Sequence, residues 1–199
     1  SVPYAIRASV AASALQVGSL TESAIQRRVT GTCNAGQAVR SIDASGGVLV
    51  TGASWDTWGT PVDPHGTNGW DLVVLKLDTD GAYQWHTFAG ANTWNYGYAI
   101  AADDEGQVYV TGKATGTWGT PLHPFSGGQD IVVLALDAAG AYRWHTFYGA
   151  AGGNSEGRGV AVDDDGYVFA SGTSSVPWGT PLHAHAYSGF TDFVVLELD

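Results

Sequence analysis

The chain has 199 residues and a formal net charge of −11, and 44% of its residues are hydrophobic. The acidic excess disfavours nucleic-acid binding, because affinity for phosphate backbones is built mainly from Lys and Arg. No apolar run is long enough to cross a bilayer, and the N-terminus lacks a basic stretch followed by an apolar signal region. These features exclude membrane insertion from the expected functions.

The first forty residues differ from the rest of the chain. They hold four arginines against the single acidic residue Glu22, and they are rich in small residues and poor in aromatic ones. The stretch Val10–Gly18 suits either a short helix or an extended arm. We therefore expect residues 1–37 to form a connector or oligomerisation arm that is separate from residues 38–199.

Residues 38–199 repeat a pattern with a period close to sixty residues. The phrase Trp-Gly-Thr-Pro begins at Trp58, Trp118 and Trp178, and similar segments flank each copy. Internal repeats of this period indicate an array of equivalent structural units. The predicted units are 38–95, 96–154 and 155–199, and the last is incomplete.

Each unit reads as four short antiparallel strands. In the middle unit VYVTG, IVVLALD and YRWHTFY are β-branched or aromatic, and Asp-x-x-Gly turns separate the strands. The Asp begins such a turn by bonding its own backbone, and the Gly accepts a positive φ at its end. We expect this structural role for Gly106, Gly140 and Gly166.

The run DIVVLALD is apolar at nearly every position, so both faces of its strand must be covered. Four-stranded sheets packed between neighbours are the blades of a β-propeller. The predicted fold is therefore all-β, with about three four-stranded antiparallel blades after a short N-terminal arm. The stretches YGYAIAADDEGQVYVTG, DIVVLALDAAG and YRWHTFYG, with their counterparts, resemble the SBBP family of bacterial β-propeller repeats over about residues 38–199.

Fewer than three full blades cannot close a ring, because known propellers need at least four. Three alternatives remain open: the native chain continues beyond Asp199, several chains complete one ring, or the N-terminal region lends a strand. Residues 23–32 are a candidate for such a strand.

The stretches VPYAIRA and IQRRVTGTCNAGQAVRSIDASG resemble a connector of trimeric phage tail-fibre-like and collagen-like bacterial surface proteins. The resemblance implies a trimer displayed outside the cell. It also implies a second cysteine where Val50 stands, so Cys33 lacks that partner. From the residues alone, Cys33 is either a buried inert thiol or a bridge between two chains.

The Trp-Gly-Thr-Pro phrase admits two interpretations. It is a rigid turn with an anchoring indole, because Pro fixes φ and each copy must solve the same packing problem. Alternatively it marks a shallow sugar site, in which aromatic faces lie beside polar groups. The candidate ligand-binding residues are Trp58, Asp63, His65, Trp118, His123, Phe125, Trp178, His183 and His185; Trp70 and Tyr187 follow the same phrase.

The remaining chemistry-bearing residues favour structure over catalysis. Trp85 and Trp144, like His86 and His145, recur in the Trp-His-Thr-Phe segment, and a catalytic histidine would seldom be duplicated. The acidic runs DDEG and DDDG lack the alternating oxygen ligands of a calcium loop. No catalytic motif is present, so we expect no enzyme, no metal and no cofactor.

The sequence predicts a non-catalytic extracellular adhesion module that binds a glycan or a cell-surface receptor, in a bacterial surface or tail-fibre-like assembly. We expect a homo-oligomer, either a trimer or a dimer that completes the ring. One alternative is a structural scaffold whose repeats self-assemble. A second is an enzyme acting on polysaccharides.

Overall fold

The computed structural model describes residues 41–183 and 191–199, which form eleven strands and no helix. The predicted arm at 1–37, Cys33, the candidate strand at 23–32 and the site candidate His185 lie outside the described residues. No described helix is long and apolar enough to cross a membrane.

The strands form three consecutive blades. Blade 1 contains β1 (Ser41–Ile42), β2 (Val48–Ser54), β3 (Asp71–Leu77) and β4 (Tyr83–Ala89) in that spatial order. Blade 2 contains β5 (Asn95–Ala102), β6 (Val108–Ala114), β7 (Gly128–Leu136) and β8 (Tyr142–Tyr148). Blade 3 contains β9 (Gly153–Val162), β10 (Val168–Ser174) and β11 (Asp192–Leu198). Neighbouring strands within each blade are antiparallel, which confirms the predicted fold class.

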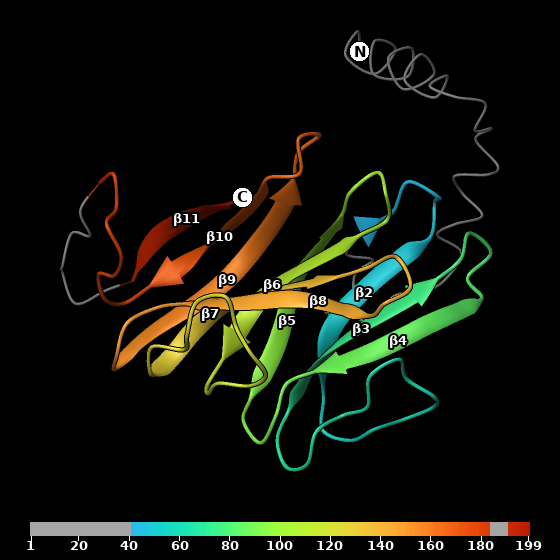
Figure 1. Cartoon of the computed structure of the whole chain (residues 1–199), viewed down its shortest axis with the longest axis horizontal. Helices are drawn as coiled ribbons and strands as arrows, with labels where there is room; N and C mark the ends of the chain where they lie inside the picture. The colour runs from blue at the N-terminus through green and yellow to red at the C-terminus, as the bar shows by residue number, and fades with distance from the viewer. Residues whose placement is uncertain (1–40, 184–190) are drawn as a thin grey trace, which may run out of the picture.

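The blades lie side by side in chain order (Figure 1). The first strand of blade 2, β5, contacts both β2 of blade 1 and β9 of blade 3. A short parallel pairing of Gly128–Gln129 with Gly153–Asn154 joins β7 to β9. The described strands therefore stack as a fan of sheets.

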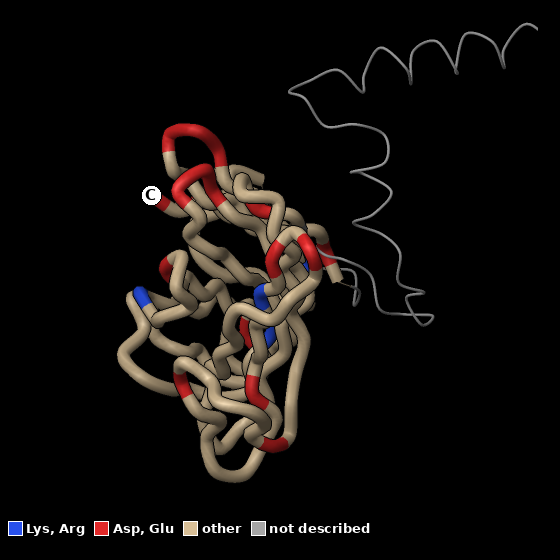
Figure 2. The backbone as a smooth tube through the Cα atoms, turned by 90° about the vertical axis from the view of Figure 1, so that its right-hand side faces the viewer, with Lys and Arg blue, Asp and Glu red and all other residues tan. Residues whose placement is uncertain are grey.

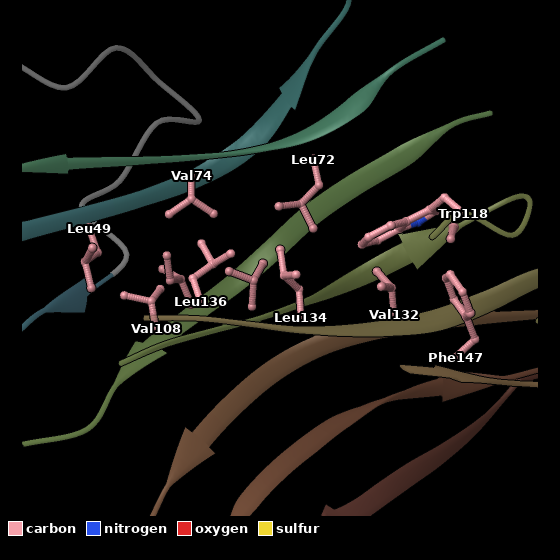
Figure 3. Close-up of a cluster of buried hydrophobic side chains, with 12 residues drawn as sticks. Leu49, Leu72, Val74, Val108, Trp118, Val132, Leu134, Leu136 and Phe147 are labelled. Carbon is pink, nitrogen blue, oxygen red and sulfur yellow. The ribbon is translucent and has the colours of Figure 1, made fainter. Parts of the chain in front are cut away.

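Strand β7 supplies side chains to both of the hydrophobic clusters that the described residues form. Val132, Leu134 and Leu136 pack with Leu72 and Val74 of β3 between blades 1 and 2 (Figure 3). The alternate residues of β7 are buried against blade 3, and they are Ile131, Val133 and Ala135. Alternation in a strand places successive side chains on opposite faces, so the uninterrupted apolar run is explained by two buried faces.

The Asp-x-x-Gly turns close the hairpins as predicted. In the turn at Asp137, the Gly140 N–H donates to the Asp137 carbonyl at 3.0 Å, and the carboxylate accepts from the Ala139 and Ala141 amides. The last residues of three such turns have positive φ: 81° at Gly106, 83° at Gly140 and 89° at Gly166. Several of the acidic stretches in Figure 2 fall on turns between strands.

Trp85 connects neighbouring blades. Its indole Nε1–H donates to the Ala138 carbonyl of blade 2 at 3.2 Å, and a Cβ at Gly140 would approach its ring to 2.6 Å. Its counterpart Trp144 is partly buried against the cluster between blades 2 and 3 and lies 6.3 Å from the Tyr109 ring. Both tryptophans thus lie where one blade meets the next.

Candidate binding site

The tryptophan of the repeated phrase stacks on the histidine of the fourth strand in blades 1 and 2. The rings of Trp58 and His86 are 3.8 Å apart and inclined by 4°, and those of Trp118 and His145 are 3.6 Å apart and inclined by 8°. Each phrase lies between the second and third strands of its blade. The stacked pair therefore fastens this connection to the fourth strand.

Hydrogen bonds hold each histidine in one orientation. His145 Nε2 lies 2.9 Å from the Trp118 carbonyl oxygen, and its Nδ1 lies 2.8 Å from the Tyr142 hydroxyl. The carbonyl accepts only, so Nε2–H donates and Nδ1 accepts from the phenol. His86 has the same two partners in blade 1, namely Trp58 and Tyr83. The duplicated histidine therefore has the same structural role in blades 1 and 2.

Burial of the imidazole lowers the pKa of His145 from 6.5 to about 4, although the bond to the Trp118 carbonyl opposes this shift. Between pH 6.5 and pH 4 this histidine binds a proton in the unfolded chain but not in the folded chain. The free energy of unfolding therefore keeps its full value, as far as His145 is concerned, above pH 6.5, and it decreases as the pH falls through 6.5 toward 4. A shift of this size corresponds to about 3 kcal/mol of unfolding free energy.

We expect the His145 ring resonances to titrate with a midpoint near pH 4 in an NMR experiment on the folded chain. Direct titration isolates this group from Asp71 and Asp130, whose pKa values are raised by burial and which therefore act in the opposite direction. A midpoint at or above pH 6 would show that the imidazole is not buried beneath Trp118.

The other predicted ligand residues in blade 1 have local partners. Asp63 binds the fourth strand through its backbone, since its carbonyl accepts from the Phe88 amide at 3.1 Å. His65 Nε2 lies 3.1 Å from the Ser54 carbonyl oxygen and 3.8 Å from the Asp71 carboxylate. These contacts tie the loop to its own blade.

Apart from Trp118, the described predicted residues in blades 2 and 3 fall into two groups. Phe125 contacts the Phe147 ring edge-on at 5.7 Å, beside the core. His123, Trp178 and His183 line one groove between blades 2 and 3, where His123 stacks on Tyr148 at 5.2 Å. The structure thus brings three of the nine predicted residues together.

Trp118 has little surface for a ligand. It is 8% exposed and stacked on His145, whereas Trp58 is 42% exposed but has one face covered by His86. A sugar that stacks on an indole needs a free ring face. The geometry therefore favours the interpretation of the phrase as an anchored turn.

A different pocket, shallow and largely open to solvent, with a volume of about 630 Å³, lies where loops of blades 1 and 2 meet. Two exposed tryptophans contribute to it: Trp55, which follows β2, and Trp94, which precedes β5, at 49% and 56% exposure. Its complete lining is Trp55, Asn68, Gly69, Asn92, Thr93, Trp94 and Thr115. None of these side chains is charged.

Hydrogen bonds and tight backbone contacts shape this pocket. Thr115 exchanges three hydrogen bonds with Trp94: its hydroxyl accepts from the Trp94 amide at 3.0 Å and donates to the Trp94 carbonyl at 3.5 Å, and its amide donates to the same carbonyl at 3.0 Å. The Thr67 hydroxyl donates to Asn92 Oδ1 at 2.9 Å, which orients the amide and leaves its NH₂ as a donor. Gly69 has φ 138°, and a Cβ there would overlap the Thr93 backbone.

The pocket tryptophans are absent from the repeat pattern. Strand register makes Thr115 the counterpart of Trp55, and Asn154 the counterpart of Trp94. Trp70, which touches Trp55 edge-on at 5.7 Å, has Gln129 as its counterpart. Five of the eight tryptophans recur in the repeat, and Trp55, Trp70 and Trp94 do not. This lack of repetition is a signal in the sequence that the sequence analysis missed.

Within residues 41–183 and 191–199, no group of three or more His, Cys, Asp or Glu side chains is placed to hold a metal ion.

The described residues define an all-β fold built from stacked propeller-type blades. A family model described as a beta-propeller repeat, SBBP, matches residues 143–177, from within β8 through β10 to the start of the third repeated phrase. The chain therefore carries an SBBP-type repeat. A search of curated proteins finds no match.

Proposed function

We propose that the chain is a non-catalytic binding module that recognises a neutral glycan in the pocket between Trp55 and Trp94. The observation that carries the proposal is the pair of exposed, unrepeated indoles beside neutral amide and hydroxyl groups. Positions that the blade architecture requires recur in each unit. These two do not, so a role outside the architecture accounts for them better.

The chemistry of the lining matches a carbohydrate. Sugar rings offer apolar C–H faces that pack on indoles, and their hydroxyls bind amides and alcohols such as those of Asn68, Asn92 and Thr115. Pockets of this kind combine aromatic walls with a few orienting polar groups. The net charge of −11 and the uncharged lining favour a neutral ligand over an anionic one.

The wider setting of the proposal is adhesion by an extracellular bacterial assembly, as the sequence resemblances imply. The proposed homo-oligomer, a trimer or a ring-completing dimer, depends on residues 1–37, which lie outside the described part of the chain. A cell-surface glycan is the partner that fits both the pocket and this setting.

We expect the purified chain to bind at least one neutral glycan on an array, and Trp94→Ala to raise the dissociation constant at least about tenfold. Buried tryptophans at binding sites commonly contribute about 2 kcal/mol or more, which exceeds a factor of ten. Trp55→Ala should weaken the same interaction. Isothermal titration calorimetry with the best array ligand measures both effects.

Tyr167→Ala is the matched control, because Tyr167 is an exposed aromatic residue of blade 3 outside the pocket. It should leave glycan affinity unchanged. Failure to bind any glycan, or binding that survives both tryptophan changes, would contradict the proposal. Release of shortened saccharides would instead indicate the polysaccharide-acting enzyme.

A further inference from the structure

His65 closes the connection between β2 and β3 on itself. This connection supplies three residues of the pocket, namely Trp55, Asn68 and Gly69. The His65 Nε2 lies 3.1 Å from the carbonyl oxygen of Ser54, the last residue of β2 and the one directly before Trp55. Its Nδ1 contacts the Gly66 carbonyl oxygen, near the other end of the connection. One ring thus holds together the two ends of the segment that shapes the pocket.

Both oxygens that face the nitrogens of the His65 ring belong to backbone carbonyls, which accept hydrogen bonds and cannot donate them. A neutral imidazole carries one N–H and can donate to only one of the two carbonyls. An imidazolium carries two N–H groups and donates to both. The ring of His145 differs, since it lies between one carbonyl and one hydroxyl. The surroundings of His65 are therefore complementary to the charged form of the ring.

A buried carboxylate supplies a counter-charge beside this ring. The His65 Nε2 lies 3.8 Å from Asp71 Oδ2, and the two side chains are 4% and 1% exposed. Burial raises the pKa of the Asp71 carboxyl, and the Gly66 amide and the charge on His65 act against this rise. On β4 the ring of Phe88 meets His65 edge-on at 5.7 Å. Within residues 41–183, none of the other titratable side chains nearby forms an ion pair or hydrogen bond with the His65 ring; these are His86 of β4 and Asp56 and Asp63 of the same connection.

Blade 2 has a phenylalanine at the equivalent position. His65 and Phe125 each follow the tryptophan of their phrase by seven positions, and the third counterpart, His185, lies outside the described residues. Phe125 meets Phe147 edge-on at 5.7 Å, just as His65 meets Phe88. An apolar ring therefore satisfies the packing of a blade. The two ring nitrogens are an additional feature of blade 1, whose connection contributes to the pocket.

We infer that the imidazolium form of His65 is a positioning residue for the pocket, because its two hydrogen bonds fix Trp55 relative to Asn68 and Gly69. Loss of the proton removes one of these hydrogen bonds, and histidine side chains change charge between about pH 5 and 8. The pocket is therefore better ordered, and binds its glycan more tightly, at the acidic end of this range. The effect on glycan affinity rests on the function proposed above, whereas the ordering of the pocket does not.

Long-range ¹H–¹⁵N NMR spectra of the full chain, recorded from about pH 5 to 8, test the inference without a glycan. We expect both ring nitrogens of His65 to carry protons at the acidic end. The Trp55 indole N–H and the Asn68 and Gly69 amide resonances should change together with the His65 ring resonances. In His65→Phe, which places the blade 2 residue in blade 1, the fold should be retained and these pH-dependent changes should be absent.

The same variant tests the effect on binding. With the best array glycan, the dissociation constant of the native chain should be at least about threefold higher at the alkaline end than at the acidic end, within the usual range for one hydrogen bond. His65→Phe should bind equally well at both ends. His123→Gln is the matched control, because His123 is an exposed histidine of the blade 2 phrase, and this variant should keep the pH dependence of the native chain.

A single protonated nitrogen on His65 at the acidic end, or pocket resonances whose pH dependence survives His65→Phe, would overturn the inference. A glycan affinity that does not change with pH would also overturn it and would leave the proposed function intact. Absence of binding to every glycan would contradict the proposed function alone, because the NMR measurements use no ligand.

Discussion

Phe147→Ala is expected to lower the free energy of unfolding by about 3–5 kcal/mol, the usual cost of truncating a buried phenylalanine. The Phe147 side chain is completely buried in the cluster between blades 1 and 2. Three rings meet it nearly edge-on: Trp118 at 5.9 Å, His145 at 5.1 Å and Phe125 at 5.7 Å. Denaturant unfolding monitored by circular dichroism measures the loss.

Leu122→Ala is the control in the same blade, because Leu122 is exposed and should change stability by less than about 0.5 kcal/mol. If Phe147→Ala does not fold, Phe147→Leu removes less volume and should cost about 1–2 kcal/mol. A loss below about 1 kcal/mol for Phe147→Ala would mean that the repeated phrase and the fourth strand do not form one packed unit.

Gly112→Ala is expected to destabilise the chain by about 3 kcal/mol or more. A Cβ at Gly112 in β6 would overlap the Tyr96 carbonyl oxygen of β5, where a register shift between Gly97 and Ala99 brings the backbones together. The atoms that this Cβ would overlap belong to the backbone of β5, which cannot rotate away as a side chain can. The overlap is relieved only if β5 and β6 move apart. Urea unfolding should show a lower midpoint with an unchanged slope.

Gly159→Ala in β9 provides the contrast. The nearest described atom to a Cβ there is the Ser171 hydroxyl, at 2.7 Å, and a serine side chain can change rotamer. We expect a change within about 1 kcal/mol. Equal losses in the two variants would show that the close approach of β5 and β6 is not the cause.

The fold could be predicted from the sequence because the same local patterns occur in each copy of the repeat. The uninterrupted apolar run DIVVLALD, the Asp-x-x-Gly turns and the spacing of Trp58, Trp118 and Trp178 are local patterns, and each predicted its element. What no local pattern supplied is the stacking of Trp118 on His145, because these residues are joined only when the fourth strand is inserted beside the phrase.

The candidate site was harder to predict for the same reason. Trp55 and Asn68 lie in the β2–β3 connection, Asn92 in the β4–β5 connection and Thr115 in the β6–β7 connection, and only the fold shows that these three connections meet at one end of blades 1 and 2. Sequence reasoning favoured the repeated tryptophans because repetition drew attention to them. Repetition indicates shared architecture, and the unrepeated Trp55 and Trp94 are better candidates for binding.

The most direct test of this division of roles uses the indole N–H resonances of the eight tryptophans, assigned by NMR and followed during titration with the best array glycan. The account predicts saturable chemical-shift changes at the indole N–H resonances of Trp55 and Trp94. The resonances of Trp58, Trp118 and Trp178 should not change. Shifts confined to the three repeated tryptophans would contradict it.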